Sequence, residues 1–115
     1  MVLDLNPVAL DWAVAEASGT PIYRSGETMT RMDVDGNVYW KPSTDWAQGG
    51  AIIEREGIGL ERDDQGIWFA SYDLSAETAW GATGKTPLEA AMRCYVSVKL
   101  GNDIELPSQL LKGVV

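Results

Sequence analysis

Two segments near the ends of the chain carry the start and stop signals of α-helices, and they constrain the fold more than any other feature. Asn6-Pro7 opens the first segment, which stops at Gly19. Thr86-Pro87 opens the second, which stops at Gly101. Asn and Thr side chains accept hydrogen bonds from the first backbone N–H groups of a helix, and Pro suits the first helical position. We therefore predict a short N-terminal helix and a long C-terminal helix.

Each predicted helix places apolar side chains on one face. In the first helix this face consists of Leu10, Ala13, Val14 and Ala17. In the second it consists of Leu88, Ala91, Met92, Tyr95 and Val98. Positions three or four apart share one side of a helix, so both faces can pack on a core. We expect Asp11 to lie away from the first face and Trp12 at its edge, and we expect Cys94 to be a small buried side chain.

Two hairpins are indicated between the helices. Residues 27–40 contain β-branched, Met and aromatic residues around Asp35-Gly36, a dipeptide typical of the tight turn between antiparallel strands. Residues 58–62 and 67–72 flank the polar turn 63–66 in the same way. Because the second of these segments is apolar on both faces, it is predicted to be an inner strand.

Together these elements predict a single α+β domain over residues 1–115. Its architecture is an antiparallel sheet of two hairpins, with the long C-terminal helix packed on one face and a short N-terminal helix. The stretch from Asp73 to Lys85 shows little periodicity and is predicted to be a loop. Asn102 to Leu106 is expected to add a short strand.

The composition excludes several kinds of chemistry. Nine Lys and Arg residues against 17 Asp and Glu residues give a net charge of -8, which repels nucleic acid backbones. With no histidine and one cysteine, the chain lacks the residues for Ser-His-Asp or Cys-His catalysis, a histidine-ligated zinc or an intrachain disulfide. No secretory signal or apolar run of membrane-spanning length is evident. We expect an acidic cytoplasmic protein without a cofactor, direct nucleic acid binding or membrane contact.

The stretch from Pro42 to Ile58 combines polar side chains, a tryptophan and two adjacent glycines. Its candidate binding residues are Ser43, Thr44, Asp45, Trp46, Gln48, Gly49 and Gly50. In a binding site, Trp46 would be a stacking wall, the polar side chains would contact the ligand, and backbone amides near the glycines would hold an anion. The alternative is structural: a tight crossing between the hairpins, held by side-chain hydrogen bonds and by Trp46 in the core.

A metal-dependent alternative uses the carboxylates of Asp45, Glu54 and Glu56. Magnesium sites often combine one or two carboxylates with substrate phosphates, so these residues would suffice for phosphoester hydrolysis if the fold brought them together. Glu54 and Glu56 point the same way only in a strand. Arg55 between them favours a solvated charged surface instead.

Residues 81–86, Gly-Ala-Thr-Gly-Lys-Thr, look like a phosphate-binding loop. That motif requires a glycine where this chain has Ala79. Helix capping explains Gly84, Thr86 and Pro87 without a nucleotide. We therefore interpret this segment as the approach to the C-terminal helix.

A set of short segments spread over most of the chain is specific enough to compare with known proteins. They are Leu10-Asp11-Trp12-Ala13-Val14-Ala15, Ser43 to Gly50 with Ile52 to Glu56, Trp68-Phe69-Ala70, Thr86 to Arg93, Lys99-Leu100-Gly101 and Leu106-Pro107. Together they resemble the NinX-like family of small proteins from tailed bacteriophages and prophages, a domain of unknown function. The resemblance implies a role in the bacterial host cytoplasm during infection or lysogeny, and it supplies no catalytic residues.

Three functions follow from these observations. The first is a non-enzymatic phage accessory protein that binds a host component or sequesters a small nucleotide-type signal. The second is the metal-assisted phosphoester hydrolase. The third is a protein–protein interaction module, for example a homodimer formed through the exposed strand of a hairpin.

Overall fold

The computed structural model describes residues 5–25, 28–33, 36–72 and 81–101, which form three helices and six strands. In chain order these are α1 (Pro7–Ser18), β1 (Ile22–Ser25), β2 (Thr28–Asp33), β3 (Gly36–Tyr39), α2 (Trp46–Glu56), β4 (Gly59–Arg62), β5 (Trp68–Ser71), β6 (Gly81–Gly84) and α3 (Pro87–Leu100). A helix followed by three strands thus occurs twice before α3. The predicted α+β class, the short N-terminal helix and the long C-terminal helix are confirmed.

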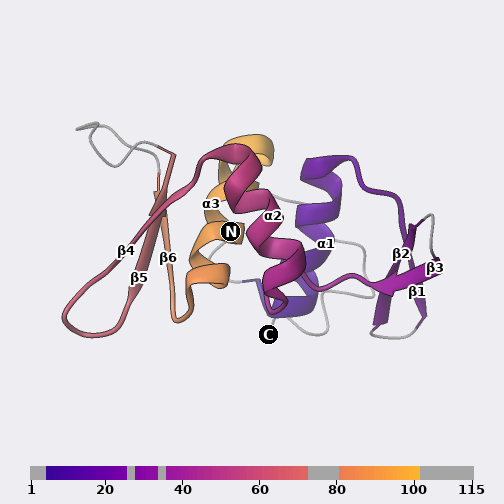
Figure 1. Cartoon of the computed structure of the whole chain (residues 1–115), viewed down its shortest axis with the longest axis horizontal. Helices are drawn as coiled ribbons and strands as arrows, with labels where there is room; N and C mark the ends of the chain where they lie inside the picture. The colour runs from indigo at the N-terminus through magenta and orange to yellow at the C-terminus, as the bar shows by residue number, and fades with distance from the viewer. Residues whose placement is uncertain (1–4, 26–27, 34–35, 73–80, 102–115) are drawn as a thin grey trace.

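The strands form two antiparallel sheets, ordered β1-β2-β3 and β4-β5-β6, at opposite ends of the helical layer (Figure 1). Both predicted hairpins are present, but they lie in different sheets, and each sheet has one further strand. In the first hairpin Asp33 pairs with Gly36, and residues 34–35 of its predicted turn lie outside the described residues. In the second, Arg62 pairs with Trp68. As predicted for residues 67–72, β5 is the inner strand of its sheet.

The turn between β4 and β5 is built by Asp63. Its Oδ1 accepts the backbone N–H groups of Gln65 and Ile67, both at 2.9 Å, and its own N–H donates to the carbonyl of Ile67 at 2.9 Å. Gly66 has a φ of 86°, a backbone conformation that favours glycine. The predicted polar turn is therefore confirmed, and local chemistry accounts for it.

The prediction of a loop from Asp73 to Lys85 was wrong at its C-terminal end. Residues 81–84 form β6, which pairs with β5 in the register Ser71 to Gly81. A Cβ atom on Gly81 would lie 2.5 Å from Cζ of Phe69, so a residue without a side chain lets the two strands approach. Residues 73–80 and the strand expected at 102–106 lie outside the described residues.

The helix ends follow the predicted capping chemistry. Asn6 Oδ1 accepts the N–H of Ala9 at 2.8 Å, and Thr86 Oγ1 accepts the N–H of Glu89 at 3.0 Å. Gly19, with a φ of 69°, ends α1 in the left-handed conformation. These contacts involve residues only a few positions apart, which is why the sequence alone predicts them.

The three helices run in the same direction, with their N-terminal ends toward the bottom of Figure 1. α3 packs against α1, α2, β5 and β6, and so joins the parts of the molecule. The buried core that results is formed mainly by Ala9, Leu10, Ala13, Val14, Trp40, Ile52, Ala70, Ala91, Met92, Cys94, Tyr95 and Val96. Cys94 is buried as predicted, and burial raises the pKa of its thiol to about 11. Within the described part of the chain, no helix has the length and apolar character of a membrane span.

Candidate binding site

A cavity of about 490 Å³ lies where the N-terminal ends of α1, α2 and α3 meet. Asn6 and Pro7 line it from the start of α1. Ser43, Thr44 and Trp46 line it from the start of α2, and residues 85–89 with Arg93 line it from α3. Its volume lies within the roughly 300–1,000 Å³ typical of small-molecule sites.

The seven candidate residues from the sequence do not form one cluster. Ser43, Thr44 and Trp46 line this cavity. Asp45 and Gln48 line a separate hollow of about 260 Å³, together with residues that include Trp40 and Arg55. The two glycines belong to neither lining. The reason is that Ser43 and Thr44 belong to the turn before α2, whereas residues 46–50 lie in the helix, which distributes consecutive side chains around its axis.

The central stretch was predicted to be either a site or a tight crossing, and it is the helix α2. Asp45 caps it, because Oδ1 accepts the N–H of Ala47 at 3.0 Å, and Gly57 ends it with a φ of 70°. The structural alternative placed Trp46 in the core, which is wrong, since this side chain is 56% exposed. Trp46 is instead part of the cavity wall.

Gly49 is required by close packing behind the cavity. A Cβ atom at this position would overlap the carbonyl oxygen of Pro42 and lie 2.6 Å from Cδ2 of Leu88. Gly50 differs, because its Cβ would make only an ordinary contact, 3.6 Å from Cε3 of Trp46. A residue without a side chain at position 49 therefore lets α2 approach Pro42 and Leu88.

Gln48 holds the connection between β3 and α2. Its Oε1 accepts the backbone N–H of Lys41 at 2.7 Å, and its Nε2 donates to the carbonyl of Tyr39 at 2.5 Å. Both groups of the amide are therefore used within the protein. This side chain therefore holds the backbone of residues 39–41 beside α2, and it does not line the 490 Å³ cavity.

Asp11 is buried, so the prediction that it lies away from the buried face of α1 is wrong. It is 4% exposed, and Oδ1 accepts the backbone N–H of Ser43 at 2.7 Å. Its carbonyl accepts the indole N–H of Trp40 at 2.8 Å. Burial raises the pKa of the Asp11 carboxyl to about 6, and the hydrogen bond from the Ser43 backbone offsets part of that rise. Asp11 thus joins α1 to the segment that leads into α2.

Two residues that line the cavity each have a buried polar atom without a partner in the described part of the chain. Among the described residues, Ser43 Oγ and Arg93 Nε are the buried side-chain nitrogen and oxygen atoms without a hydrogen bond. The Ser43 hydroxyl is near enough to Asp11 to lower the pKa of that carboxyl, but it is not in hydrogen-bonding geometry. Arg93 Nη1 is engaged, at 2.9 Å from both the Thr83 carbonyl and Glu89 Oε1.

The carboxylates of the metal-dependent alternative are separated along α2. Asp45 caps the N-terminal end, whereas Glu54 lies about 13 Å further along the helix axis. Because the segment is helical, Glu54 and Glu56 do not point the same way, contrary to the strand that this alternative required. Within the described residues, no three His, Cys, Asp or Glu side chains are grouped so as to hold a metal ion.

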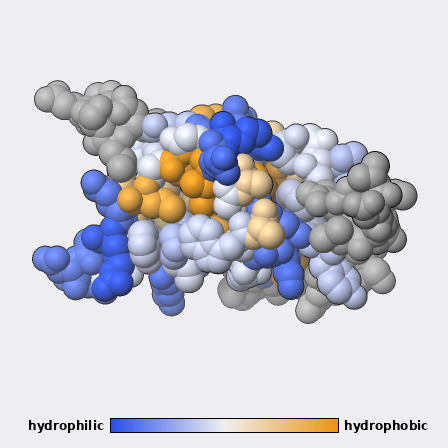
Figure 2. Space-filling view, in the orientation of Figure 1, coloured by the Kyte–Doolittle hydropathy of each residue, from blue (hydrophilic) through white to orange (hydrophobic). Residues whose placement is uncertain are grey.

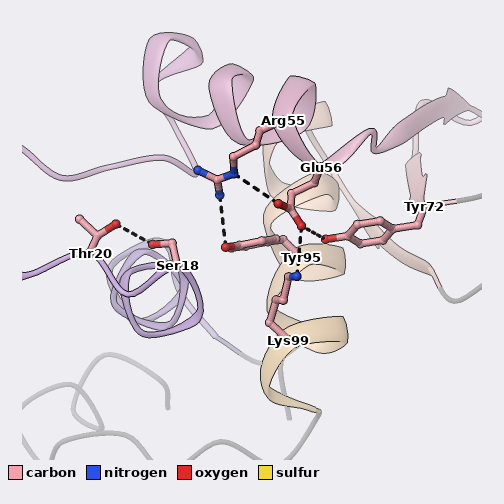
Figure 3. A network of polar contacts seen from close by, with 7 residues as sticks. All are labelled: Ser18, Thr20, Arg55, Glu56, Tyr72, Tyr95 and Lys99. Carbon is pink, nitrogen blue, oxygen red and sulfur yellow. Dashed lines mark hydrogen bonds and ion pairs between the residues drawn. The ribbon is translucent and has the colours of Figure 1, made fainter.

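Glu56 instead belongs to a polar cluster that joins the C-terminal ends of α2 and α3 (Figure 3). Its carboxylate is 3.1 Å from the Tyr72 hydroxyl, 3.3 Å from Arg55 Nε and 3.4 Å from Lys99 Nζ. Burial acts to raise the pKa of Glu56, but the contacts with these three partners outweigh it and leave the pKa below its ordinary value. Arg55 Nη2 also donates to the Tyr95 hydroxyl at 3.3 Å.

Comparison with protein families shows to which family the chain belongs. Residues 1–99 match the family described as Bacteriophage P22, NinX. The chain belongs to this NinX family. The match extends from the N-terminus through both sheets and almost to the end of α3, so the resemblance noted in the sequence is confirmed. A comparison with curated proteins finds no match.

The sequence of this NinX protein did not reveal the part of the wall formed by α3. The sequence indicates Thr86 as a helix cap, includes Lys85 only in the apparent phosphate-binding loop 81–86, and gives Arg93 no part in a site. Arg93 pairs with Glu89, four positions before it on α3. The side chain of Arg93 is 16% exposed and faces the cavity. The available signal was a lysine directly before a helix cap. It indicates a binding site only when other helices begin beside it, which the sequence does not show.

Proposed function

We propose that this NinX protein is a non-enzymatic phage accessory protein that binds a small ligand in the cavity at the helix N-termini. The observation that carries the proposal is the position of Trp46. Its large aromatic side chain is 56% exposed on the cavity wall, whereas Trp12, Trp40 and Trp68 pack in or against the core. A flat aromatic wall beside polar groups suits a ligand with a ring and polar substituents.

The ligand class that fits this wall best is a small nucleotide-type molecule from the host. The ring would stack on Trp46, and the polar groups would face Ser43 and Thr44 on the same wall. Such a protein would act by withholding the ligand, because the cavity wall has hydrogen-bonding groups and contains no histidine to serve as a general base. The hydrolase alternative receives no support from the positions of Asp45 and Glu54 on α2.

A thermal-shift experiment on the full chain tests this proposal. The panel consists of nucleotides, cyclic dinucleotides and ADP-ribose derivatives, and a ligand at 100 times its Kd adds about 2.7 kcal/mol of stability. We expect a shift that is lost in Trp46→Ala and retained in Tyr39→Ala. Tyr39 is the matched control, since it is 64% exposed and lies outside the cavity lining. A shift that survives in Trp46→Ala, or no shift with any member of the panel, would contradict the proposal.

A further inference from the structure

The electrostatic character of the cavity follows from the direction of the helices. α1, α2 and α3 all begin at its wall, since it is lined by Asn6 and Thr86, the caps of α1 and α3, and by Trp46, the first residue of α2. A helix N-terminus carries roughly half a positive charge, because its first N–H groups have no partners within the helix. These ends favour a negatively charged occupant, although the carboxylate of Asp45 already caps α2 and the chain has a net charge of -8.

Two cationic side chains add to this field. Lys85 is exposed beside the start of α3, and its ammonium group makes no ion pair within the described part of the chain. Arg93 lies two turns into α3, and its guanidinium reaches back to the Thr83 carbonyl. Glu89 is the one acidic side chain on the wall, and Arg93 neutralises it at 2.9 Å. The cavity wall therefore has one positive charge in excess, before the helix ends are considered.

The unpaired atoms provide evidence that is independent of the helix ends. Ser43 is 5% exposed, and its Oγ has no hydrogen bond. Arg93 Nε is buried and equally without one in the described part of the chain. Leaving a buried donor unpaired costs roughly 1–3 kcal/mol, and such groups in proteins usually have a partner. Both atoms belong to residues that line the same cavity.

We propose that the cavity contains a phosphate subsite, in which Lys85, Ser43 Oγ and Arg93 Nε hold the phosphate of the ligand at the N-terminal end of α3. This inference rests on the proposed function and narrows it to a phosphorylated ligand whose ring stacks on Trp46. A phosphate presents several acceptor oxygens, which matches donors that come from different directions. The acidic remainder of the surface repels long polyanions, so a small phosphate ester is selected over nucleic acid.

Asp11 limits the strength of this subsite. Its carboxylate lies behind Ser43 and accepts the backbone N–H of that residue at 2.7 Å. A negative charge here opposes a bound phosphate. The hydrogen bond nevertheless fixes the Ser43 backbone, and so positions its side chain on the wall.

Isothermal titration calorimetry on the full chain tests the subsite with three probes: pyrophosphate, AMP and adenosine. Lys85→Ala is compared with Lys41→Ala, which removes the same charge from an exposed residue outside the cavity. We expect AMP and pyrophosphate to bind and adenosine to bind much more weakly. We expect Lys85→Ala to weaken AMP binding about tenfold, as the loss of one charge-assisted contact should. Lys41→Ala should leave it nearly unchanged.

The other outcomes separate the subsite from the proposed function. Adenosine binding as tightly as AMP, with loss in Trp46→Ala, would overturn the subsite and leave the small-ligand function standing. Equal weakening of AMP binding in Lys85→Ala and Lys41→Ala would also overturn the subsite. The effect would then come from the total charge of the protein and not from a contact in the cavity. Pyrophosphate binding as tightly as AMP, unaffected by Trp46→Ala, would support the subsite and contradict the stacking of a ring. Failure of both phosphate probes at millimolar concentration would overturn the subsite.

Discussion

The N-terminal and C-terminal ends of the three helices use polar groups in opposite ways. At the C-terminal end, Glu56 is bound by Arg55 of α2, by Lys99 of α3 and by Tyr72, which follows β5 (Figure 3). At the N-terminal end, the buried Ser43 Oγ and Arg93 Nε have no partner among the described residues. The first arrangement satisfies its own hydrogen bonds, whereas the second contains the unpaired atoms on which the proposed phosphate subsite rests.

This difference suggests that the two ends serve different purposes. A cluster whose partners are all internal contributes to folding, because no solvent or ligand is needed to complete it. A cavity with unpaired donors lowers the stability of the free protein and favours the bound form. Figure 2 shows an apolar area on the face toward the viewer and hydrophilic residues at the tip of the β4–β5 hairpin. Substitutions can test each side of this comparison.

The largest expected effect comes from the packing behind the cavity. Gly49→Val should destabilise the protein by more than about 3 kcal/mol, because its side chain would overlap the carbonyl of Pro42 and Leu88. Chemical denaturation measures this loss. Gly50→Ala is the control, and it should be neutral or stabilising, since its Cβ meets only Trp46 at 3.6 Å and alanine favours the helix. Equal effects of the two substitutions would show that the N-terminal end is loosely packed.

Asp11 should make stability depend on pH. Its folded pKa of about 6 lies above the unfolded value of 3.8, so the associated stability is full below pH 3.8 and is lost as the pH rises through 6. The total is on the order of 3 kcal/mol, of which about half falls between pH 5 and pH 7.5. Denaturation at these two pH values should show a loss in the wild type that Asp11→Asn largely removes. An identical pH dependence in both proteins would assign the loss to other groups.

Glu56→Gln tests whether the C-terminal cluster serves folding. We expect a loss of about 1–2 kcal/mol at pH 7, because a charge-assisted hydrogen bond and two ion pairs are removed. The folded pKa of Glu56 is lowered, so its contribution is present above the unfolded value of 4.5 and is lost as the pH falls through the folded pKa. The difference between variant and wild type should therefore shrink in acid. Glu54→Gln, an exposed neighbour on α2, should be neutral, and ligand binding should be unaffected by either substitution.

The smallest effect on stability is expected for Ser43→Ala. Oγ is buried without a hydrogen bond, which favours its removal, but it also lowers the pKa of the Asp11 carboxyl. We therefore expect its removal to change stability by no more than about 1 kcal/mol in either direction. The same substitution should weaken AMP binding in calorimetry. Thr86→Ala is the contrasting variant, since its hydroxyl caps α3 and its loss should cost about 1 kcal/mol. A larger destabilisation by Ser43→Ala, with unchanged binding, would reverse the comparison between the two ends.

The amino-acid sequence was sufficient where the deciding contacts are local. Asn6, Thr86 and Asp63 bond to backbone groups two to four residues away, so the ends of the helices and the polar turn could be predicted. The apolar pattern also indicated β5 as an inner strand. Short strands such as β1 and β6 were missed, because four residues show little periodicity and their pairing depends on a neighbouring strand.

The tertiary structure alone decided the candidate site. Gly49-Gly50 suggested a tight crossing between the hairpins, yet both residues lie within α2, where a glycine at position 49 allows the helix to approach Pro42 and Leu88. Asp11 appeared to be a surface acid, yet Ser43, 32 positions away, donates to it. The chain encodes each helix start through its own cap, but only the packing of α3 against α1 and α2 brings the three starts to one cavity. The burial of Asp11, the unpaired atoms of Ser43 and Arg93 and the electric field in the cavity all depend on that long-range packing. Patterns of residues close together in the sequence do not predict it.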